Sequence, residues 1–573
     1  MAKFLLGFLT GVLLIFLAVV LLFFALLRFR EKPPVIAGNS ALVLRLRDEI
    51  PERPPVELPE FLGGSAGVTV ANVWMSLRKA AVDPHIKAVV LEPETLAVGW
   101  ARLEEFRRDL EQFRKSGKPV YAFLRMPGAR EYYLALAADR IYLGPQEPLI
   151  LKGMRAELMY FKNTLEKIGV SVEVEHAGKY KDFGDMFTRA GMSPETREVI
   201  GSVVDDLYGN LVARIAAARG KSPDEVRAII DQGPFTAAQA RQAGLVDELR
   251  FEDQVWGELK DRLHSGELNK VSLDKYMKVP PESVGLQGRS RIALLIGEGD
   301  IVRGSPGDDA SAGSSITSYG FDKLLRQLAA DSLIKGVVVR INSPGGEVMA
   351  SDEIWHEMNL LSKKKPLVVS MSDVAASGGY YMALTGDPLV AYPQTVTGSI
   401  GVVYGKPNLH GLYDKLGITK DAIQRGKHAA IDSDYTSLAP DERQLLRRAI
   451  DENYRDFVAK VAAARHRPFD DIEPLAQGRV WMGDQAKTRG LVDELGGLDT
   501  ALDLVKKKAG IPAPEQVTLL MYPARRNVID VLLSRSQNDM LESQLARVFG
   551  RMPFHAWMHG GLLRAMPYWI DVR

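Results

Sequence analysis

Apolar residues recur along the chain in short runs of strand length, and these runs alternate with stretches of helical spacing. Residues 291–302 and 335–341 are rich in β-branched apolar residues, whereas residues 319–330 and 352–364 place apolar side chains every three or four positions. The first pattern predicts buried strands and the second predicts amphipathic helices. Because strands that alternate with helices typically form a parallel sheet, we expect an α/β fold.

The same pattern occurs twice in the chain. Residues 77–90 match residues 325–338 with 8 identities in 14 positions, and residues 132–146 match residues 380–394 with 7 in 15, both at an offset of 248. The hexapeptide GLVDEL also occurs twice, at an offset of 246. Two matches at one offset, with a further match after a slip of two residues, indicate a tandem duplication.

The duplication divides the chain into domains. We expect one repeat at residues 40–280 and the other at residues 288–512. Residues 513–573 have helical spacing over most of their length, which predicts a mainly helical C-terminal extension that belongs to neither repeat.

An uncharged stretch of 24 residues, at positions 4–27, precedes both repeats. About 20 apolar residues span a bilayer, and charged residues rather than a small-residue cleavage site follow, so we expect an uncleaved transmembrane anchor in the lipid bilayer. Lys3 precedes this stretch, and Arg28, Arg30 and Lys32 follow it. The difference in charge slightly favours a cytoplasmic position for the body of the protein.

The composition excludes several classes of function. The 73 basic and 72 acidic residues give a net charge of +1, so no field of one sign favours nucleic acid as a partner. The chain has no cysteine, which excludes disulfides, thiolate catalysis and cysteine-ligated zinc. Histidine is scarce, and the segment WHEMNL lacks the second histidine of a zinc helix. We therefore expect neither a metal nor another cofactor.

A small polar residue stands where a predicted strand meets a predicted helix. In the segment SDVAASGGYYMALTGD, Ser377 follows an apolar run and precedes two glycines. Backbone N–H groups at the start of a helix lack intrahelical partners, so Gly378 is a candidate donor to an oxyanion. A second donor is available from NSPGG, at Gly345 or Gly346, after the preceding strand. Loops at the carboxyl edge of a parallel sheet are a usual place for a site.

The repeats differ at the chemically important positions. Ser377 of the second repeat corresponds to Ala129 of the first, whereas Lys181 of the first corresponds to Ala429 of the second. A lysine can act as a general base when burial lowers its pKa. The complementary losses predict one composite site, with the nucleophile Ser377 from the second repeat and the base Lys181 from the first.

Four stretches give the chain a specific resemblance. NSPGG, ASGGYY, TGSIGV and GKYK, together with the anchor and the two repeats, resemble the long-form signal peptide peptidase A family of membrane-anchored serine proteases. The resemblance implies two tandem repeats of the Clp-protease/crotonase type after one transmembrane helix. It also implies that Ser377 is the nucleophile, Lys181 the general base and Ser399 the residue that orients the lysine. The implied oxyanion donors are Gly378 and either Gly345 or Gly346.

The resemblance further implies a biological role. Members of this family degrade signal peptides that remain in the membrane after cleavage from secreted proteins, and they assemble as bowl-shaped homotetramers. Their catalytic body lies outside the cytoplasm, so the resemblance implies a bacterial inner-membrane protein with a periplasmic body. This orientation is opposite to the one that the flanking charges slightly favour.

Two other interpretations remain open from the residues. The crotonase fold also supports acyl-CoA enzymes, whose oxyanion hole needs no nucleophile, and Ser377 would then be incidental. A membrane scaffold with a degenerate site would retain the repeats without any activity. Labelling of Ser377 by a fluorophosphonate separates the peptidase from the first alternative, and hydrolysis of peptides separates it from the second.

Overall fold

The computed structural model describes residues 33–53, 67–305, 315–524 and 561–566, with a few isolated positions near each end. The predicted anchor at residues 4–27 lies mostly outside the described residues. Among the residues that are described, no helix is long and apolar enough to cross a membrane.

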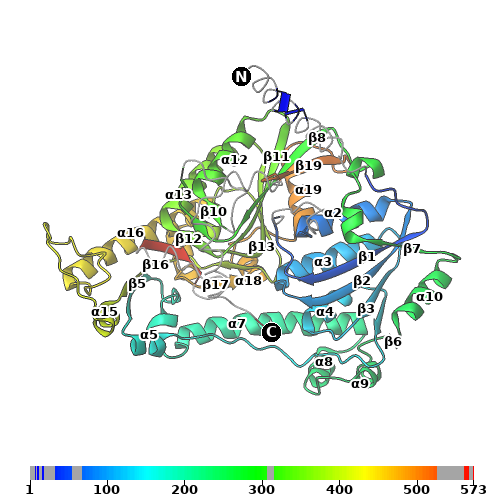
Figure 1. The fold of residues 1–573 in the computed structure, drawn as a ribbon, viewed down its shortest axis with the longest axis horizontal. Helices are drawn as coiled ribbons and strands as arrows, with labels where there is room; N and C mark the ends of the chain where they lie inside the picture. Colours follow the sequence, from blue (N-terminus) through cyan, green and yellow to red (C-terminus); the bar gives the residue numbers. More distant parts are fainter. Residues whose placement is uncertain are drawn as a thin grey trace.

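The first repeat contains a parallel sheet with the strand order β6-β4-β3-β2-β1-β7 (Figure 1). Helices α2 and α3 pack on one face and α10 packs on the other, so both faces of the central strands are buried and apolar. The strands are β1 (Ser40–Asp48), β2 (Ile86–Leu96), β3 (Val120–Leu124), β4 (Arg140–Leu143), β6 (Glu248–Leu249) and β7 (Asn269–Ser272). The helices are α2 (Val70–Val82), α3 (Trp100–Arg114), α4 (Ala129–Ala135), α8 (Pro223–Ile230), α9 (Ala237–Gln242), α10 (Glu252–Arg262) and α11 (Leu273–Met277).

The second repeat has a related sheet with the order β17-β15-β13-β11-β8-β19, in which β14 and β18 branch from β13 and the pair β15–β17 is antiparallel. Helices α12 and α13 cover one face, and α19 covers the other together with α2 of the first repeat. The strands are β8 (Ser290–Glu298), β11 (Ile334–Ser343), β13 (Leu367–Ala376), β14 (Leu389–Ala391), β15 (Val396–Gly398), β17 (Val480–Met482), β18 (Glu494–Leu495) and β19 (Val517–Tyr522). The helices are α12 (Ser318–Ala330), α13 (Val348–Ser362), α14 (Gly378–Met382), α17 (Phe469–Ile472), α18 (Gly483–Thr488) and α19 (Leu498–Lys508), and the short 3₁₀ turns are η2 (Pro281–Val284) and η3 (Glu473–Leu475). The predicted α/β fold with two tandem repeats is confirmed.

A further sheet joins the two repeats, with the order β10-β9-β12-β20-β16-β5. Strand β5 (Ser171–Ala177) comes from the first repeat and pairs antiparallel with β16 (Val402–Asn408) of the second. The remaining strands are β9 (Ile301–Val302), β10 (Ile316–Thr317), β12 (Gly345–Glu347) and β20 (Gly561–Ala565). Residues of the two halves of the chain are therefore held in one hydrogen-bonded layer.

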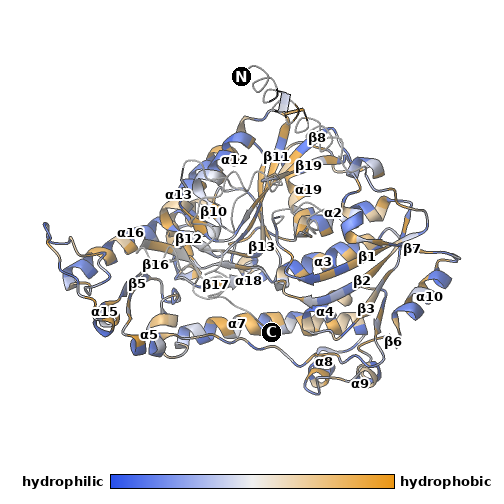
Figure 2. Cartoon of the chain, in the orientation of Figure 1, coloured by the Kyte–Doolittle hydropathy of each residue, from blue (hydrophilic) through white to orange (hydrophobic). Residues whose placement is uncertain are grey.

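One long helix contacts both repeats. Helix α7 (Pro194–Arg219) begins with a Ser193 side chain that accepts from the Thr196 N–H, and it ends at Gly220 in the left-handed region. It contacts α4 of the first repeat and β17 of the second, and Figure 1 shows it running beneath both. Figure 2 shows apolar strands inside and polar helix surfaces outside. The other helices here are α5 (Lys162–Ile168), α6 (Asp185–Thr188), α15 (His410–Leu416) and α16 (Pro440–Ala464).

The C-terminal extension differs from its prediction in the part that is described. Residues 517–522 form β19, which pairs in parallel with β8 at the edge of the second sheet, and residues 561–565 form β20. The apolar run VTLLMY forms hydrogen bonds with the open edge of β8. The spacing of apolar residues within the run does not reveal this distant partner. The helices predicted between residues 525 and 560 lie outside the described residues. The extension thus contributes strands to two sheets.

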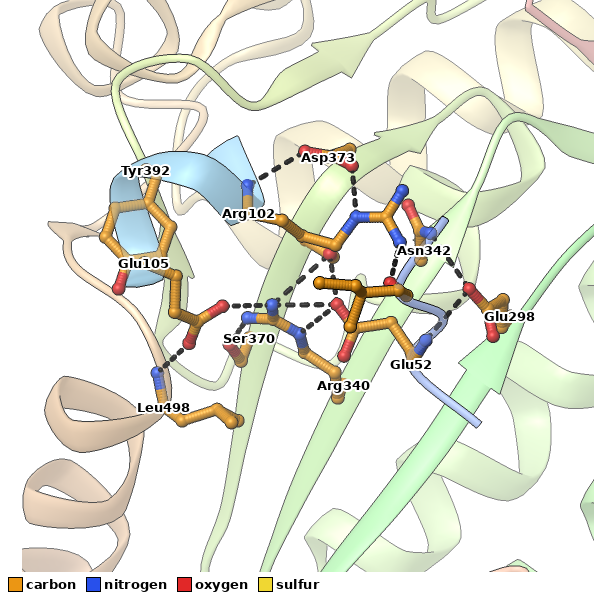
Figure 3. A network of polar contacts seen from close by, with 12 residues as sticks. Glu52, Arg102, Glu105, Glu298, Arg340, Asn342, Ser370, Asp373, Tyr392 and Leu498 are labelled. Atoms are coloured by element: carbon orange, nitrogen blue, oxygen red, sulfur yellow. Dashed lines mark hydrogen bonds and ion pairs between the residues drawn. The ribbon is translucent and has the colours of Figure 1, made fainter. Parts of the chain in front are cut away.

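Buried charges lie between the repeats, as Figure 3 shows. Arg340 on β11 is fully buried and donates to Glu52, at 2.9 Å, and to Glu105 on α3. Burial opposes its charge, but the carboxylates of Glu105 and Glu52 hold the pKa of Arg340 above its usual value. Arg102 on α3 pairs with Asp373 on β13. The charges therefore fix α3 of the first repeat against the strand that leads to Ser377.

Candidate active site

Ser377 occupies a strained turn between β13 and α14. Its backbone has φ 55° and ψ −115°, a conformation that residues other than glycine rarely adopt. The turn is held because the Ser377 N–H donates to the Gly398 carbonyl at 2.8 Å and the Ser377 carbonyl accepts from the Tyr381 N–H at 2.8 Å. The predicted strand-to-helix turn is confirmed, and such local strain is characteristic of functional sites.

The side chain of Lys181 reaches this turn from the first repeat. Its Nζ lies 2.8 Å from the Ser377 Oγ, 2.9 Å from the Ser399 Oγ and 2.9 Å from the Ser399 carbonyl oxygen. All three residues are fully buried. The structure therefore brings together the three side chains that the sequence singled out, and it does so within one chain.

The approach of Lys181 depends on residues that the sequence reasoning missed. The Tyr180 N–H donates to the Gln477 carbonyl at 2.7 Å, and the Lys179 N–H donates to the Gln477 Oε1 at 3.0 Å. Gly478 has φ 75°, and a Cβ there would lie 2.6 Å from the Cβ of Lys181. Gln477 and Gly478 thus position the loop that carries Lys181. Comparison of the two repeats did not single them out, because neither residue has a side chain expected to take part in the reaction.

Asp182 places an acidic group next to the lysine. Burial raises the pKa of the Asp182 carboxyl to about 6, while a hydrogen bond from the Thr196 hydroxyl and the charge of Lys181 act in the opposite direction. Asp182 is therefore ionised above about pH 6. Its charge favours the ammonium form of Lys181, whereas burial of the amine disfavours that form.

The candidate oxyanion donors lie in two elements that contact each other. Gly378 is the first residue of α14, which packs against β12. Gly345 and Gly346 lie in β12, where the Gly345 N–H donates to the Ser343 Oγ at 3.2 Å and Gly346 pairs with Ile301 of β9. The two glycines of NSPGG are therefore held in a short strand beside the Ser377 turn.

The equivalent turn of the first repeat is filled by a carboxylate. Ala129 stands in place of the serine at the start of α4. The Glu131 side chain accepts from the Leu96 N–H at 2.5 Å and from the Gly128 N–H at 2.8 Å. These backbone donors are thus engaged by the protein itself, at a turn that has alanine in place of serine.

No group of three or more His, Cys, Asp or Glu side chains in the described residues is arranged to hold a metal ion. The polar chemistry that converges on Ser377 is that of a hydroxyl, an amine and backbone N–H groups.

Comparison with known proteins identifies the family. The peptidase family S49 model matches residues 112–265 and 359–512, one stretch in each repeat, and the Clp protease model matches residues 292–397. The chain belongs to peptidase family S49. Both repeats of this S49 chain accordingly have the Clp protease-like α/β fold.

Relatives that are named as proteases match this S49 chain over most of their length. The chain is 36% identical over 490 residues to "Serine protease SPPA, chloroplastic" of Arabidopsis thaliana, covering 85% of this chain and 71% of the relative. It is 32% identical over 477 residues to "Protease 4" of Salmonella typhi, covering 81% and 75%. "Protease 4" of Haemophilus influenzae is 30% identical over 516 residues, covering 85% and 83%. The chain is thus a serine protease. The comparisons support neither of the two alternatives, an acyl-CoA enzyme or a membrane scaffold.

Proposed function

We propose that this protease cleaves peptide bonds with Ser377 as the nucleophile and Lys181 as the general base. The observation that carries the proposal is the contact of 2.8 Å between the Lys181 Nζ and the Ser377 Oγ, both buried. The nucleophile then comes from the repeat at residues 288–512 and the base from the repeat at residues 40–280. An activated serine needs a base within hydrogen-bond distance, and this amine meets that requirement.

The proposed reaction follows the serine–lysine form of acyl transfer. The Ser377 Oγ attacks the peptide carbonyl carbon while the neutral Lys181 amine takes the hydroxyl proton. The ammonium then gives this proton to the leaving amine as the peptide C–N bond breaks. Water, deprotonated by the same amine, hydrolyses the acyl-enzyme and restores the serine.

Ser399 and the glycines have supporting roles in this proposal. The Ser399 hydroxyl and carbonyl both lie 2.9 Å from the Lys181 Nζ, which fixes the direction of the amine. The N–H of Gly378, with that of Gly345 or Gly346, would stabilise the oxyanion that forms on the carbonyl oxygen. One such donor contributes about 2.7–4 kcal/mol in acyl transfer.

The pH dependence of hydrolysis tests the base. Because only the neutral amine accepts a proton, we expect kcat/KM to rise between about pH 7 and pH 9. Asp182→Asn removes a charge that favours the ammonium form, so the rise should move to lower pH. The exposed Asp205→Asn variant should leave the profile unchanged. A profile that is flat from pH 7 to pH 9 would exclude Lys181 as the base.

We extend the proposal to location and substrate. Residues 4–27 would anchor the protein in the bacterial inner membrane with its body in the periplasm, and the substrates would be cleaved signal peptides. The uncharged length of that segment supports the anchor. A C-terminal reporter enzyme that is active in only one compartment tests the orientation.

We also propose that the protease forms a homotetramer. The reason is that the second repeat exposes a segment whose equivalent in the first repeat is a paired strand. In the first repeat, β5 pairs with β16 of the second. The equivalent segment of the second repeat, residues 419–425, is exposed along its whole length. Strand β16 itself corresponds to residues 154–160 of the first repeat. Pairing of residues 419–425 with residues 154–160 of another copy would link chains head to tail and allow a ring to close.

Ile423 tests this assembly. Its side chain is 90% exposed, so Ile423→Asp should not destabilise the isolated chain but should bury a charge in the proposed interface. We expect the molar mass in detergent, measured by light scattering after size-exclusion chromatography, to fall from that of a tetramer to that of smaller species. Leu333→Asp, at another exposed apolar position, is the matched control. An unchanged mass for Ile423→Asp would contradict the interface.

A further inference from the structure

The C-terminal strand β20 lies inside the sheet that surrounds the candidate active site. It pairs antiparallel with β12, where Gly345 faces Ala565, and antiparallel with β16, where Val403 faces Leu563. The Met566 N–H extends this pairing by donating to the Pro344 carbonyl at 2.9 Å. The red strand in Figure 1 shows its position next to β12 and β16. A segment from the far end of the chain therefore fills the space between these two strands.

Both neighbouring strands belong to the site. Strand β12 contains the candidate oxyanion glycines, and β16 begins three residues after Ser399 and pairs with β5, which leads to Lys181. An extended peptide that adds a strand to sheet edges gains main-chain hydrogen bonds without a required sequence. The gap between β12 and β16 thus has the geometry of a groove for an extended peptide, and β20 occupies it.

The occupant is held by apolar contacts as well as by the backbone. Leu563 is 1% exposed and packs with Val403, Phe183 and Phe187, and Met566 is 5% exposed. The same contacts offer an apolar environment to an external peptide of apolar composition. A peptide and β20 cannot use the same hydrogen-bonding edges at once.

The same segment also contacts the corresponding region of the first repeat. The Val572 carbonyl accepts from the Trp100 Nε1 at 3.4 Å and from Arg130 at 3.2 Å, and Val572 forms an antiparallel bridge with Ala156. An offset of 248 relates these three contact residues to residues in or beside the groove of the second repeat: Val348, Gly378 and Tyr404. The C-terminal segment thus makes related contacts in the active repeat and in the degenerate one.

We propose that strand β20 is an internal competitive ligand, and that an apolar peptide must displace it from between β12 and β16 before it reaches Ser377. The inference rests on the proposed peptidase function, to which it adds a regulatory step. The contact of Val572 with the first repeat would keep the segment close to the groove after release. The free enzyme would then be largely closed to peptides that bind too weakly to displace the segment.

A reversible crosslink tests the proposal in the full chain. The chain has no cysteine, so Val403→Cys with Leu563→Cys introduces a single pair. Facing residues of antiparallel strands have Cα atoms about 4.5–5.5 Å apart, which a disulfide can bridge. We expect oxidation to form the crosslink and to lower hydrolysis of an added peptide by about tenfold or more, and a reductant to restore it. The two single-cysteine variants are the controls.

A substitution that weakens docking should have the opposite effect. Leu563→Asp places a charge at a buried position of β20, and we expect it to lower the KM for an added apolar peptide at least about threefold with kcat unchanged. Leu563→Met is the conservative control and should behave like the native protein. If β20 were only a structural strand, Leu563→Asp would lower both activity and melting temperature. That result, or full activity of the oxidised crosslinked protein, would overturn the proposal.

Binding measurements separate this inference from the proposed function. In a Ser377→Ala chain, a fluorescein-labelled peptide with the sequence of residues 561–572 should bind more tightly when Leu563→Asp is also present. It should not bind to the oxidised crosslinked form. If these binding results are obtained but no variant with Ser377 hydrolyses peptides, the proposed function is wrong, while the inference that β20 occupies the peptide groove is retained. Equal binding by all forms overturns the inference, whatever the activity.

Discussion

Ser377→Ala and Lys181→Ala should each abolish peptide hydrolysis, with kcat/KM lower by about 10⁴-fold or more. The expected loss is large because, in the proposed dyad, the two groups act on one proton across 2.8 Å and neither can replace the other. The double variant should lose about as much as either single variant, since residues that act as a unit are not additive. Hydrolysis of a fluorogenic apolar peptide by detergent-solubilised protein measures the effect.

Matched variants separate this loss from unfolding. Lys179→Ala changes an exposed lysine two positions from Lys181, and Ser332→Ala changes an exposed serine of the second repeat. Both should retain activity within about twofold, because surface substitutions usually have small effects. A fluorophosphonate should label Ser377 in the native chain and should leave Ser377→Ala unlabelled. Near-native turnover by either Ser377→Ala or Lys181→Ala would exclude the dyad.

Arg340→Met should lower the stability of the protein by about 3–5 kcal/mol, because it leaves two buried carboxylates without their shared cation. Arg340 bonds to Glu52 and Glu105 in a site that water does not reach. Differential scanning calorimetry should show a lower melting temperature. Activity should fall as well, since the same interface holds the strand that leads to Ser377.

Two further variants identify charge as the cause. Replacing both carboxylates in the Arg340→Met chain, by Glu52→Gln and Glu105→Gln, should recover part of the lost stability because no charge then stays buried alone. Arg227→Met removes an arginine from an exposed pair with Asp224 and should cost less than about 1 kcal/mol. An Arg340→Met chain with native stability would show that the buried network is not needed for the contact between the repeats.

The local features of the site were accessible from the sequence. A β-branched apolar run before Ser377 and glycines after it predict a strand-to-helix turn, because both signals act over a few residues. The strain at Ser377 is not visible in the sequence, since it depends on contacts such as the one from its N–H to Gly398. The comparison of the two repeats pointed to Lys181 because its counterpart Ala429 lacks an amine.

Long-range pairing was not accessible in this way. Strand β20 has no counterpart in either repeat, and its partners β12 and β16 lie more than 150 residues earlier in the chain. Hydrogen bonds between strands carry little sequence information, so an apolar segment does not reveal which edge it will join. Burial of Arg340 was also unforeseen, because arginine is mostly exposed and its partners lie in distant segments.

The sequence by itself determined the tandem α/β repeats, the turn at Ser377 and the complementary placement of Ser377 and Lys181 in different repeats, because periodicity and duplication are written in the order of residues. The tertiary structure decided three further features: the 2.8 Å contact of Lys181 with Ser377, the buried charges between the repeats and the placement of β20 beside the site. Each of these depends on which distant surfaces pack together. That choice follows from the burial and hydrogen-bond satisfaction of the whole chain, and no single segment contains it.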